Sequence, residues 1–209
     1  MRARSYKPRK VNVVTLGCAK NIFDSEVMMA QLRANDFEVE HEAKQDDSGI
    51  VIVNTCGFIE AAKQETAAIA QGLAELLEPG DLITLDGTLG AGKTFFIRAL
   101  CESLSVPREA GVSSPSYSLV NLYDGGRIPI AHLDLYRLGD EEELEGLGFR
   151  DLLDGRRLVL IEWPQQAGGL EDLATIQLEI EDHGPELRQL ILRAEDPELR
   201  ASIQRALAR

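Results

Sequence analysis

The sequence predicts an α/β fold with a partly parallel β-sheet. Short apolar runs rich in β-branched residues alternate with segments of helical periodicity, and a glycine-rich turn joins one of these runs directly to a helix. The chain has 209 residues, of which 44% are hydrophobic, so it can fill a core and form one or two domains. Disorder is therefore not expected.

Two strand-then-helix units occupy the first 65 residues. The β-branched run Val11–Leu16 predicts a strand, and apolar residues at helical spacing between Asp24 and Ala34 predict a helix after it. Ile50–Cys56 is a continuous apolar run of the kind that is buried in a parallel sheet, and a second helix is expected between Phe58 and Leu77. We interpret this part as a βαβα Rossmann-like fragment.

The rest of the chain predicts a second series of elements. A short strand at Leu82–Leu85 runs into the glycine-rich turn, and Phe95–Leu104 has helical periodicity. Beyond these we expect, in order, a hairpin of Leu119–Tyr123 and Ile128–Tyr136, a helix start at Asp140–Glu145, a buried strand at Leu158–Ile161, an antiparallel pair of Ile176–Ile180 and Leu187–Leu192, and a helix at Pro197–Leu207.

The charge of the chain limits the partners that it can bind by itself. There are 22 Lys and Arg against 35 Asp and Glu, which gives a net charge of −13, and most of the excess acid lies after residue 65. Such a surface repels the phosphates of nucleic acid, so a chain that grips DNA or RNA directly is disfavoured. We expect protein partners instead.

Membrane and secreted classes are also disfavoured. No apolar run approaches the roughly 18 residues that cross a bilayer, and the basic N-terminus leads into a run too short for a cleavable leader. Cys18, Cys56 and Cys101 lie far apart without C-x-x-C spacing, and an odd number does not build a disulfide framework. We expect a soluble protein of the reducing cytoplasm.

The glycine-rich turn is the strongest motif, because it matches G-x-x-x-x-G-K-[ST] at every fixed position between a strand and a helix. Its backbone N–H groups and the positive end of the helix would face phosphate oxygens. Lys93 would place a charge between the terminal phosphates, and Thr94 would offer a hydroxyl to Mg²⁺. The turn therefore predicts a nucleoside triphosphate site, made of Gly87, Thr88, Leu89, Gly90, Ala91, Gly92, Lys93 and Thr94.

Two acids at strand ends are candidates to complete this site. Glu162 ends the apolar run LVLIE, and Asp134 ends another apolar strand in HLDLYR. With Lys93 they form the predicted catalytic set, and with Thr94 the predicted metal ligands, so phosphoryl transfer to water or to an acceptor is the expected reaction class. His132 is expected to be structural, since no second His or Cys has ligand spacing to it.

Several motifs in series between about residues 65 and 194 resemble the bacterial TsaE family, the ATPase of the tRNA threonylcarbamoyladenosine (t6A) modification pathway. In order they are ET, LDGTLGAGKTFFIRAL, SSPSYSLVNLY, HLDLYRL, LGFRDLL and LVLIEWP. The resemblance implies a P-loop NTPase fold with ATP and Mg²⁺ as cofactors. It also implies ATP hydrolysis in complex with the TsaB and TsaD proteins, through which tRNA would be reached only indirectly.

The resemblance adds residues to the expected site. It implies that Thr66 contacts the nucleotide base, that Ser114–Tyr117 form a switch loop near the γ-phosphate, and that Trp163 lies beside the site. Trp163 could equally pack in the core. The family has an acid where Thr88 stands and Thr where Ser116 stands, and we expect both departures to alter rate rather than to abolish binding.

A different resemblance covers about residues 10–65. VNVVTLGCAKNIFDSE and IVIVNTCGFIEAAKQE are similar to the N-terminal domain of the RimO and MiaB methylthiotransferases, radical-SAM enzymes in which such cysteines hold an auxiliary iron–sulfur cluster. Cys18 and Cys56 match two of these ligands, but the third ligand and the C-x-x-x-C-x-x-C motif have no match in the sequence. We interpret the segment as a structural remnant whose cysteines are ordinary packing residues.

The two resemblances divide the chain into a truncated methylthiotransferase-like fragment, 1–64, and a P-loop ATPase domain, 65–209, whether as a natural fusion or as a mis-assembled gene. The expected helix between Phe58 and Leu77 begins in one pattern and ends in the other. Ile50–Asn54 could then replace the strand that precedes this helix in the TsaE family, which would place both parts in one sheet. Three alternatives to the ATPase stay open: a stand-alone small-molecule kinase, a RimO-like iron–sulfur fragment, and a module that nucleotide only switches.

Overall fold

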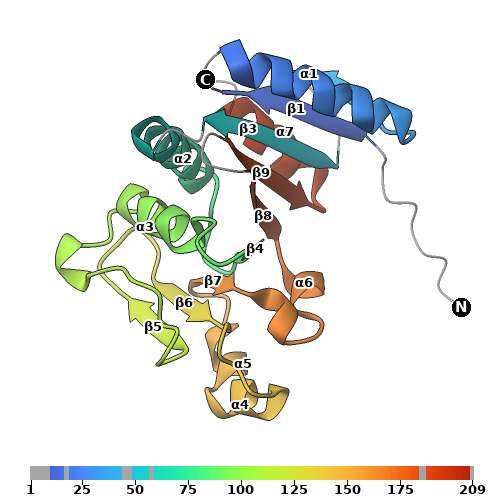
Figure 1. Cartoon of the computed structure of the whole chain (residues 1–209). Coiled ribbons are helices and arrows are strands. Elements are labelled where there is room, and N and C mark those ends of the chain that lie inside the picture. Colours follow the sequence, from blue (N-terminus) through green and yellow to red (C-terminus); the bar gives the residue numbers. More distant parts are fainter. Residues whose placement is uncertain (1–9, 17–18, 44–48, 57–58, 184–186, 208–209) are drawn as a thin grey trace, which may run out of the picture.

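A computed structural model describes residues 10–16, 19–43, 49–56, 59–183 and 187–207. In this part, one nine-stranded mixed sheet has the order β2-β1-β3-β9-β8-β4-β7-β6-β5 (Figure 1). The strands are β1 (Lys10–Thr15), β2 (Glu38–His41), β3 (Ile50–Cys56), β4 (Leu82–Gly87), β5 (Val120–Tyr123), β6 (Ile130–Asp134), β7 (Leu158–Glu162), β8 (Ile176–Asp182) and β9 (Leu187–Ala194). The predicted α/β class with a partly parallel sheet is confirmed.

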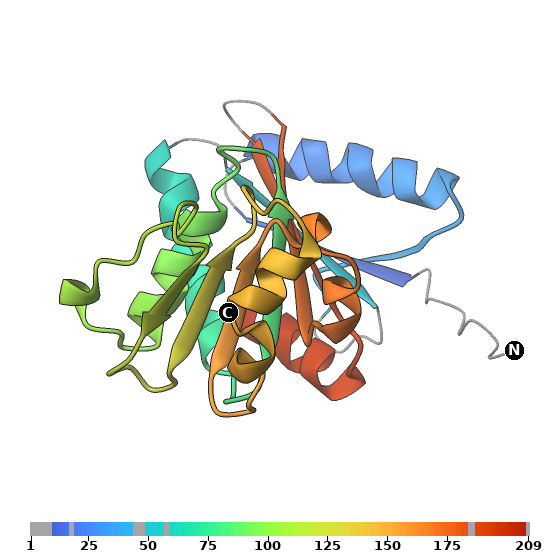
Figure 2. The ribbon, with the colours of Figure 1, turned by 90° about the horizontal axis from the view of Figure 1, so that it is seen from below.

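Helices cover both faces of the sheet, as the view from below also shows (Figure 2). They are α1 (Ala19–Ala34), α2 (Ile59–Ala74), α3 (Lys93–Ser103), α4 (Glu141–Gly146), α5 (Phe149–Leu152), α6 (Leu170–Leu173) and α7 (Pro197–Leu207). One buried cluster joins the sheet to α2, α3 and α7, and two others join the opposite face to α1 and to α4, α5 and α6. None of the helices in the described ranges is long and apolar enough to cross a membrane.

Alternation along the strands explains these layers. In β7, Leu158 and Leu160 belong to the cluster under α2 and α3, whereas Val159 and Ile161 belong to the cluster under α4, α5 and α6. Successive side chains of a strand point to opposite faces, so Glu162 lies on the α3 face with Leu160. The apolar runs that predicted strands are therefore continuous because both faces of the sheet are covered.

The N-terminal part is joined to the rest of the chain within the sheet. β3 pairs antiparallel with β9 over its whole length, from Ile50 opposite Arg193 to Cys56 opposite Leu187. Val51 and Val53 lie in the same buried cluster as Leu190 and Leu192. The expected sharing of one sheet is therefore observed, and the predicted division between residues 64 and 65, which falls within α2, stays a prediction.

One strand was missed by the sequence analysis. β2 has the sequence EVEH, pairs with β1 and forms an edge of the sheet that the described strands make. Only Val39 packs against the apolar cluster beneath α1, so the strand carries almost no apolar signal. Charged side chains on an edge strand also discourage pairing with another chain.

Candidate functional site

The predicted phosphate loop connects β4 to α3 at the carboxyl end of β4. Three glycines of the loop have positive φ angles: 144° at Gly87, 84° at Gly90 and 114° at Gly92. These values lie in a region that glycine adopts at little cost, and a Cβ at Gly87 would come 2.4 Å from the carbonyl oxygen of Ile180. Gly92 forms the N-cap of α3, so the loop ends at the positive end of an eleven-residue helix.

Lys93 folds back over its own loop. Its Nζ donates to the carbonyl oxygens of Gly87 at 2.7 Å and Thr88 at 3.1 Å, and it lies 3.8 Å from the centre of the Trp163 ring. Burial lowers the pKa of Lys93 from its usual value, and the negative charges of nearby carboxylates, above all Glu162, oppose that shift. The ammonium is thus held by weak neutral partners, which a phosphate could replace.

Thr94, in the first turn of α3, is in direct contact with Glu162, the last residue of β7. The Thr94 hydroxyl lies 2.8 Å from Oε1 and 3.1 Å from Oε2 of Glu162, whose side chain is buried. The pairing of β6 with β7 places Asp134 opposite Glu162. The three predicted metal ligands therefore come from adjacent elements and meet on the α3 face of the sheet.

Asp134 is tied to the predicted switch loop. One carboxylate oxygen accepts from the Ser114 hydroxyl at 2.5 Å, and the other accepts from the backbone N–H of Tyr136 at 3.1 Å. Ser116 donates its backbone N–H to the Ser114 oxygen at 3.3 Å. A movement of the Asp134 side chain would therefore change the hydrogen bonds that hold the segment from Ser114 to Ser116.

The aromatic residue after Glu162 lies at the site rather than in the centre of the core. Trp163 is half-buried, has a left-handed backbone with φ of 61°, and packs its ring 4.9 Å from that of Tyr136. A left-handed tryptophan costs about 1–3 kcal/mol and is found where the surroundings enforce it. Trp163 also packs against the buried cluster under α4, α5 and α6, and its expected place beside a bound nucleotide stays a prediction.

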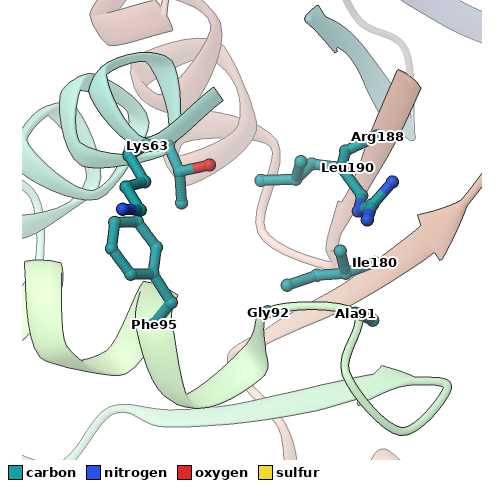
Figure 3. A pocket seen from close by; sticks show the side chains of 8 residues that line it. Lys63, Ala91, Gly92, Phe95, Ile180, Arg188 and Leu190 are labelled. Atoms are coloured by element: carbon teal, nitrogen blue, oxygen red, sulfur yellow. The ribbon is translucent and has the colours of Figure 1, made fainter. Parts of the chain in front are cut away.

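Thr66 lies on α2, close to the end of the phosphate loop at Gly92. It lines a small cavity with Gly92, Phe95 and residues of β8 and β9 (Figure 3). The Lys63 and Arg188 side chains bracket this cavity, and Phe95 presents its ring to it. The cavity is next to the N-cap of α3, so a molecule whose phosphates filled the loop could extend into it.

The oxygen atoms of Thr94, Asp134 and Glu162 are ligands of the kind that a hard divalent cation prefers. A hydroxyl from Thr94 and carboxylates from Asp134 and Glu162 are oxygen ligands, and Mg²⁺ commonly uses one or two carboxylates and completes its shell with water and phosphate oxygens. Within the described part of the chain, no group of three or more His, Cys, Asp or Glu is arranged to hold a metal. A cation at this site would therefore depend on the nucleotide for ligands.

Most of the residues predicted for the site lie close together, but two contacts were not predicted. His132, expected to be only structural, has its Nε2 3.0 Å from Oε1 of Glu162. The Lys93 contact with Trp163 was not foreseen either. Cys18 and the side chain of Cys56 lie outside the described residues, so the structure does not bear on their predicted role.

Comparison with known proteins gives two separate matches. Residues 60–190 match the family model described as threonylcarbamoyl adenosine biosynthesis protein TsaE. The TsaE of Bacillus subtilis is 35% identical over 131 residues, which are 63% of this chain and 80% of the relative. That of Rickettsia felis is 36% identical over 139 residues, which are 66% of this chain and 80% of the relative.

A solved structure agrees with this match. The crystal structure of Bacillus subtilis YdiB superposes with a TM-score of 0.56 at 26% identity, and the alignment covers 75% of this chain and 93% of the other. YdiB supports a P-loop NTPase fold for the larger part of the sheet. The fold that the resemblance implied is thereby confirmed.

The N-terminal match is to another group of proteins. Residues 10–94 match the uncharacterized protein family UPF0004. The ribosomal protein uS12 methylthiotransferase RimO of Flavobacterium johnsoniae is 49% identical over 92 residues, which are 43% of this chain and 21% of the relative. The chain thus spans about a fifth of the length of that relative, whereas the TsaE match covers more than half of the chain. On the phosphate loop, the fold and this longer match, the chain belongs to the TsaE family.

Proposed function

We propose that the chain binds ATP with Mg²⁺ at the phosphate loop and hydrolyses it. The observation that carries the proposal is the contact of Thr94 with Glu162 at 2.8 Å beside the N-cap of α3. It sets a metal-binding hydroxyl and a carboxylate next to a cradle of backbone N–H groups. Bound Mg²⁺ would neutralise the charge of the terminal phosphates and hold them in place.

Each residue of the site then has a defined task. Lys93 leaves the carbonyl oxygens of Gly87 and Thr88 and pairs with phosphate oxygens, which are stronger acceptors. With Mg²⁺ bound, the Thr94 hydroxyl oxygen would be one of its ligands, and Glu162 would no longer accept from that hydroxyl. The Glu162 carboxylate would orient the attacking water, and Asp134, which accepts from the Ser114 hydroxyl, would help to hold the cation.

The nucleotide base is proposed to enter the cavity lined by Thr66 and Phe95. This cavity begins at Gly92, where the phosphates would end, and it offers an aromatic ring and a hydroxyl. The Trp163 ring caps the other side of Lys93. Ser116, linked through Ser114 to Asp134, would respond to the γ-phosphate as part of a switch loop.

We further propose that this ATPase serves tRNA threonylcarbamoyladenosine formation with TsaB and TsaD. Family membership supports the pathway, and the names of the relatives from Bacillus subtilis and Rickettsia felis state it for those proteins. A net charge of −13 fits a division of labour in which partner proteins contact the tRNA. It also fits a cytoplasmic protein without a membrane partner.

Calorimetric titration and phosphate release test the nucleotide proposal. Lys93→Ala should abolish binding of Mg-ATP, and Glu162→Gln should bind Mg-ATP but lose about 10²-fold or more in turnover. Glu102→Gln, an exposed acid near the end of α3, serves as the matched control and should behave as the wild type. Normal hydrolysis by Glu162→Gln would remove Glu162 from the mechanism.

Turnover with and without purified TsaB and TsaD tests the pathway. Stimulation by the pair supports the proposal. Release of ADP that depends on a small molecule and not on these proteins would instead favour a stand-alone kinase. The RimO-like reading rests on the N-terminal match alone, and iron in protein purified without oxygen would support it.

A further inference from the structure

His132 is the middle residue of β6, the second strand from one edge of the sheet, and lies beside the proposed site. It is fully buried in β6, on the same face as Asp134, and its neighbour on β7 is Leu160. Its Nε2 lies 3.0 Å from Oε1 of Glu162, while the Tyr123 ring lies 6.2 Å from the imidazole ring, centre to centre. Burial of a histidine in an apolar strand costs free energy unless its ring nitrogens find hydrogen-bond partners.

The surroundings select one form of the imidazole. Among the described residues, Nδ1 of His132 has no hydrogen-bond partner. A proton on Nδ1 would therefore be a buried donor with nothing to bind, and Nε2 would then face the Glu162 carboxylate lone pair to lone pair. A ring with its proton on Nε2 avoids both costs, so Nε2–H donates to Oε1.

Oε1 of Glu162 thus has two donors in this structure, the Thr94 hydroxyl at 2.8 Å and His132 at 3.0 Å. In the proposed function, Thr94 leaves Glu162 to bind the cation. Among the described residues, the carboxylate would then keep one donor, His132, and without it the group could rotate away from the position that orients water.

We propose that His132 is the positioning residue for Glu162. Its Nε2–H holds Oε1 in place while Thr94 is released, so that the second oxygen, Oε2, stays directed at the water. The inference rests on the proposed ATP hydrolysis and adds to it a residue that touches neither nucleotide nor metal. Loss of such a supporting contact typically lowers activity about 10–100-fold.

Two amide substitutions at His132 give a matched test. A glutamine amide nitrogen is four bonds from Cα, as Nε2 of histidine is, whereas an asparagine nitrogen is three bonds away and corresponds to Nδ1. We expect His132→Gln to keep turnover within a few-fold of the wild type and His132→Asn to lose about 10–100-fold in kcat, with KM for Mg-ATP little changed. Equal turnover of His132→Asn and the wild type would overturn the inference.

A spectroscopic measurement on the whole chain, without nucleotide, keeps the inference testable if His132→Asn does not fold. The chain has three histidines, so the imidazole nitrogens can be assigned by NMR. We expect one ring with its proton on Nε2 and slow exchange with water, and we expect its proton signal to move in Glu162→Gln because the acceptor loses its charge. A proton on Nδ1, or an unmoved signal, would overturn it.

These readouts separate the two proposals. If the wild type hydrolyses ATP and His132→Asn does so equally well, only the role of His132 fails. If the wild type with TsaB and TsaD does not turn over ATP, the proposed function fails, and the positioning of Glu162 for hydrolysis fails with it.

Discussion

The Lys93 ammonium lies over the face of the Trp163 indole at 3.8 Å, and the two residues come from opposite sides of the same site, α3 and the end of β7. The ring holds a cation whose hydrogen-bond acceptors, among the described residues, are two neutral carbonyl oxygens. Such a cation–π contact is worth about 0.5–2 kcal/mol, less than a phosphate offers, so it stabilises the loop without blocking it.

Nucleotide binding should therefore change the fluorescence of Trp163. The chain has one tryptophan, so its emission reports on the surroundings of Trp163, of which Lys93 is a part. Withdrawal of Lys93 toward phosphate should alter the intensity on titration with Mg-ATP, and Lys93→Ala should show no titration at all. A saturable change of the same size in Lys93→Ala would contradict the coupling of the two residues.

Gly87 should not tolerate a side chain. Its φ of 144° disfavours any L-residue, and a Cβ would lie 2.4 Å from the Ile180 carbonyl oxygen. We expect Gly87→Ala to lower the free energy of unfolding by about 1–3 kcal/mol and to weaken Mg-ATP binding, measured by thermal denaturation and calorimetry. Gly146→Ala is the control, because a Cβ at that helical position meets no described atom within 4 Å and should be neutral or stabilising.

The two parts of the chain should unfold together. Val53 is fully buried in β3 beside β9, so Val53→Ala should destabilise the whole chain by about 1–3 kcal/mol. We expect a single transition in which tryptophan emission and far-UV circular dichroism change at the same temperature. Cleavage by protease near residue 60 that leaves a stable ATPase fragment would contradict this shared sheet.

Cys101 should make the protein less stable in alkali. Burial raises the pKa of its thiol from 9.0 to about 12, so between these values the unfolded chain has lost a proton that the folded chain keeps. The unfolded state is then favoured, and stability should fall with rising pH by about 1.4 kcal/mol per unit across that window. Urea denaturation at pH 8 to 10 measures this, and Cys101→Ala, compared over the same range, should remove this component of the slope.

The sequence was sufficient for elements with strong local signals. Apolar runs predicted β3 and β7, two strand-like segments around the Gly125-Gly126 turn predicted the hairpin of β5 and β6, and the spacing of glycines predicted the phosphate loop at the start of α3. It failed for β2, which is charged and lies at an edge. The contact between His132 and Glu162 could not be predicted, because it depends on the register of β6 against β7 rather than on spacing within either strand.

The antiparallel pairing of β3 with β9 has a consequence for solubility. Removal of the N-terminal part would leave one side of β9, eight residues long, with backbone donors and acceptors turned to water. Such a rim is a template for self-association into stacked chains. The RimO-like segment pairs with this side of β9, so the unpaired edge of the sheet is β2 instead. The glutamates of β2 disfavour pairing with another copy of the chain.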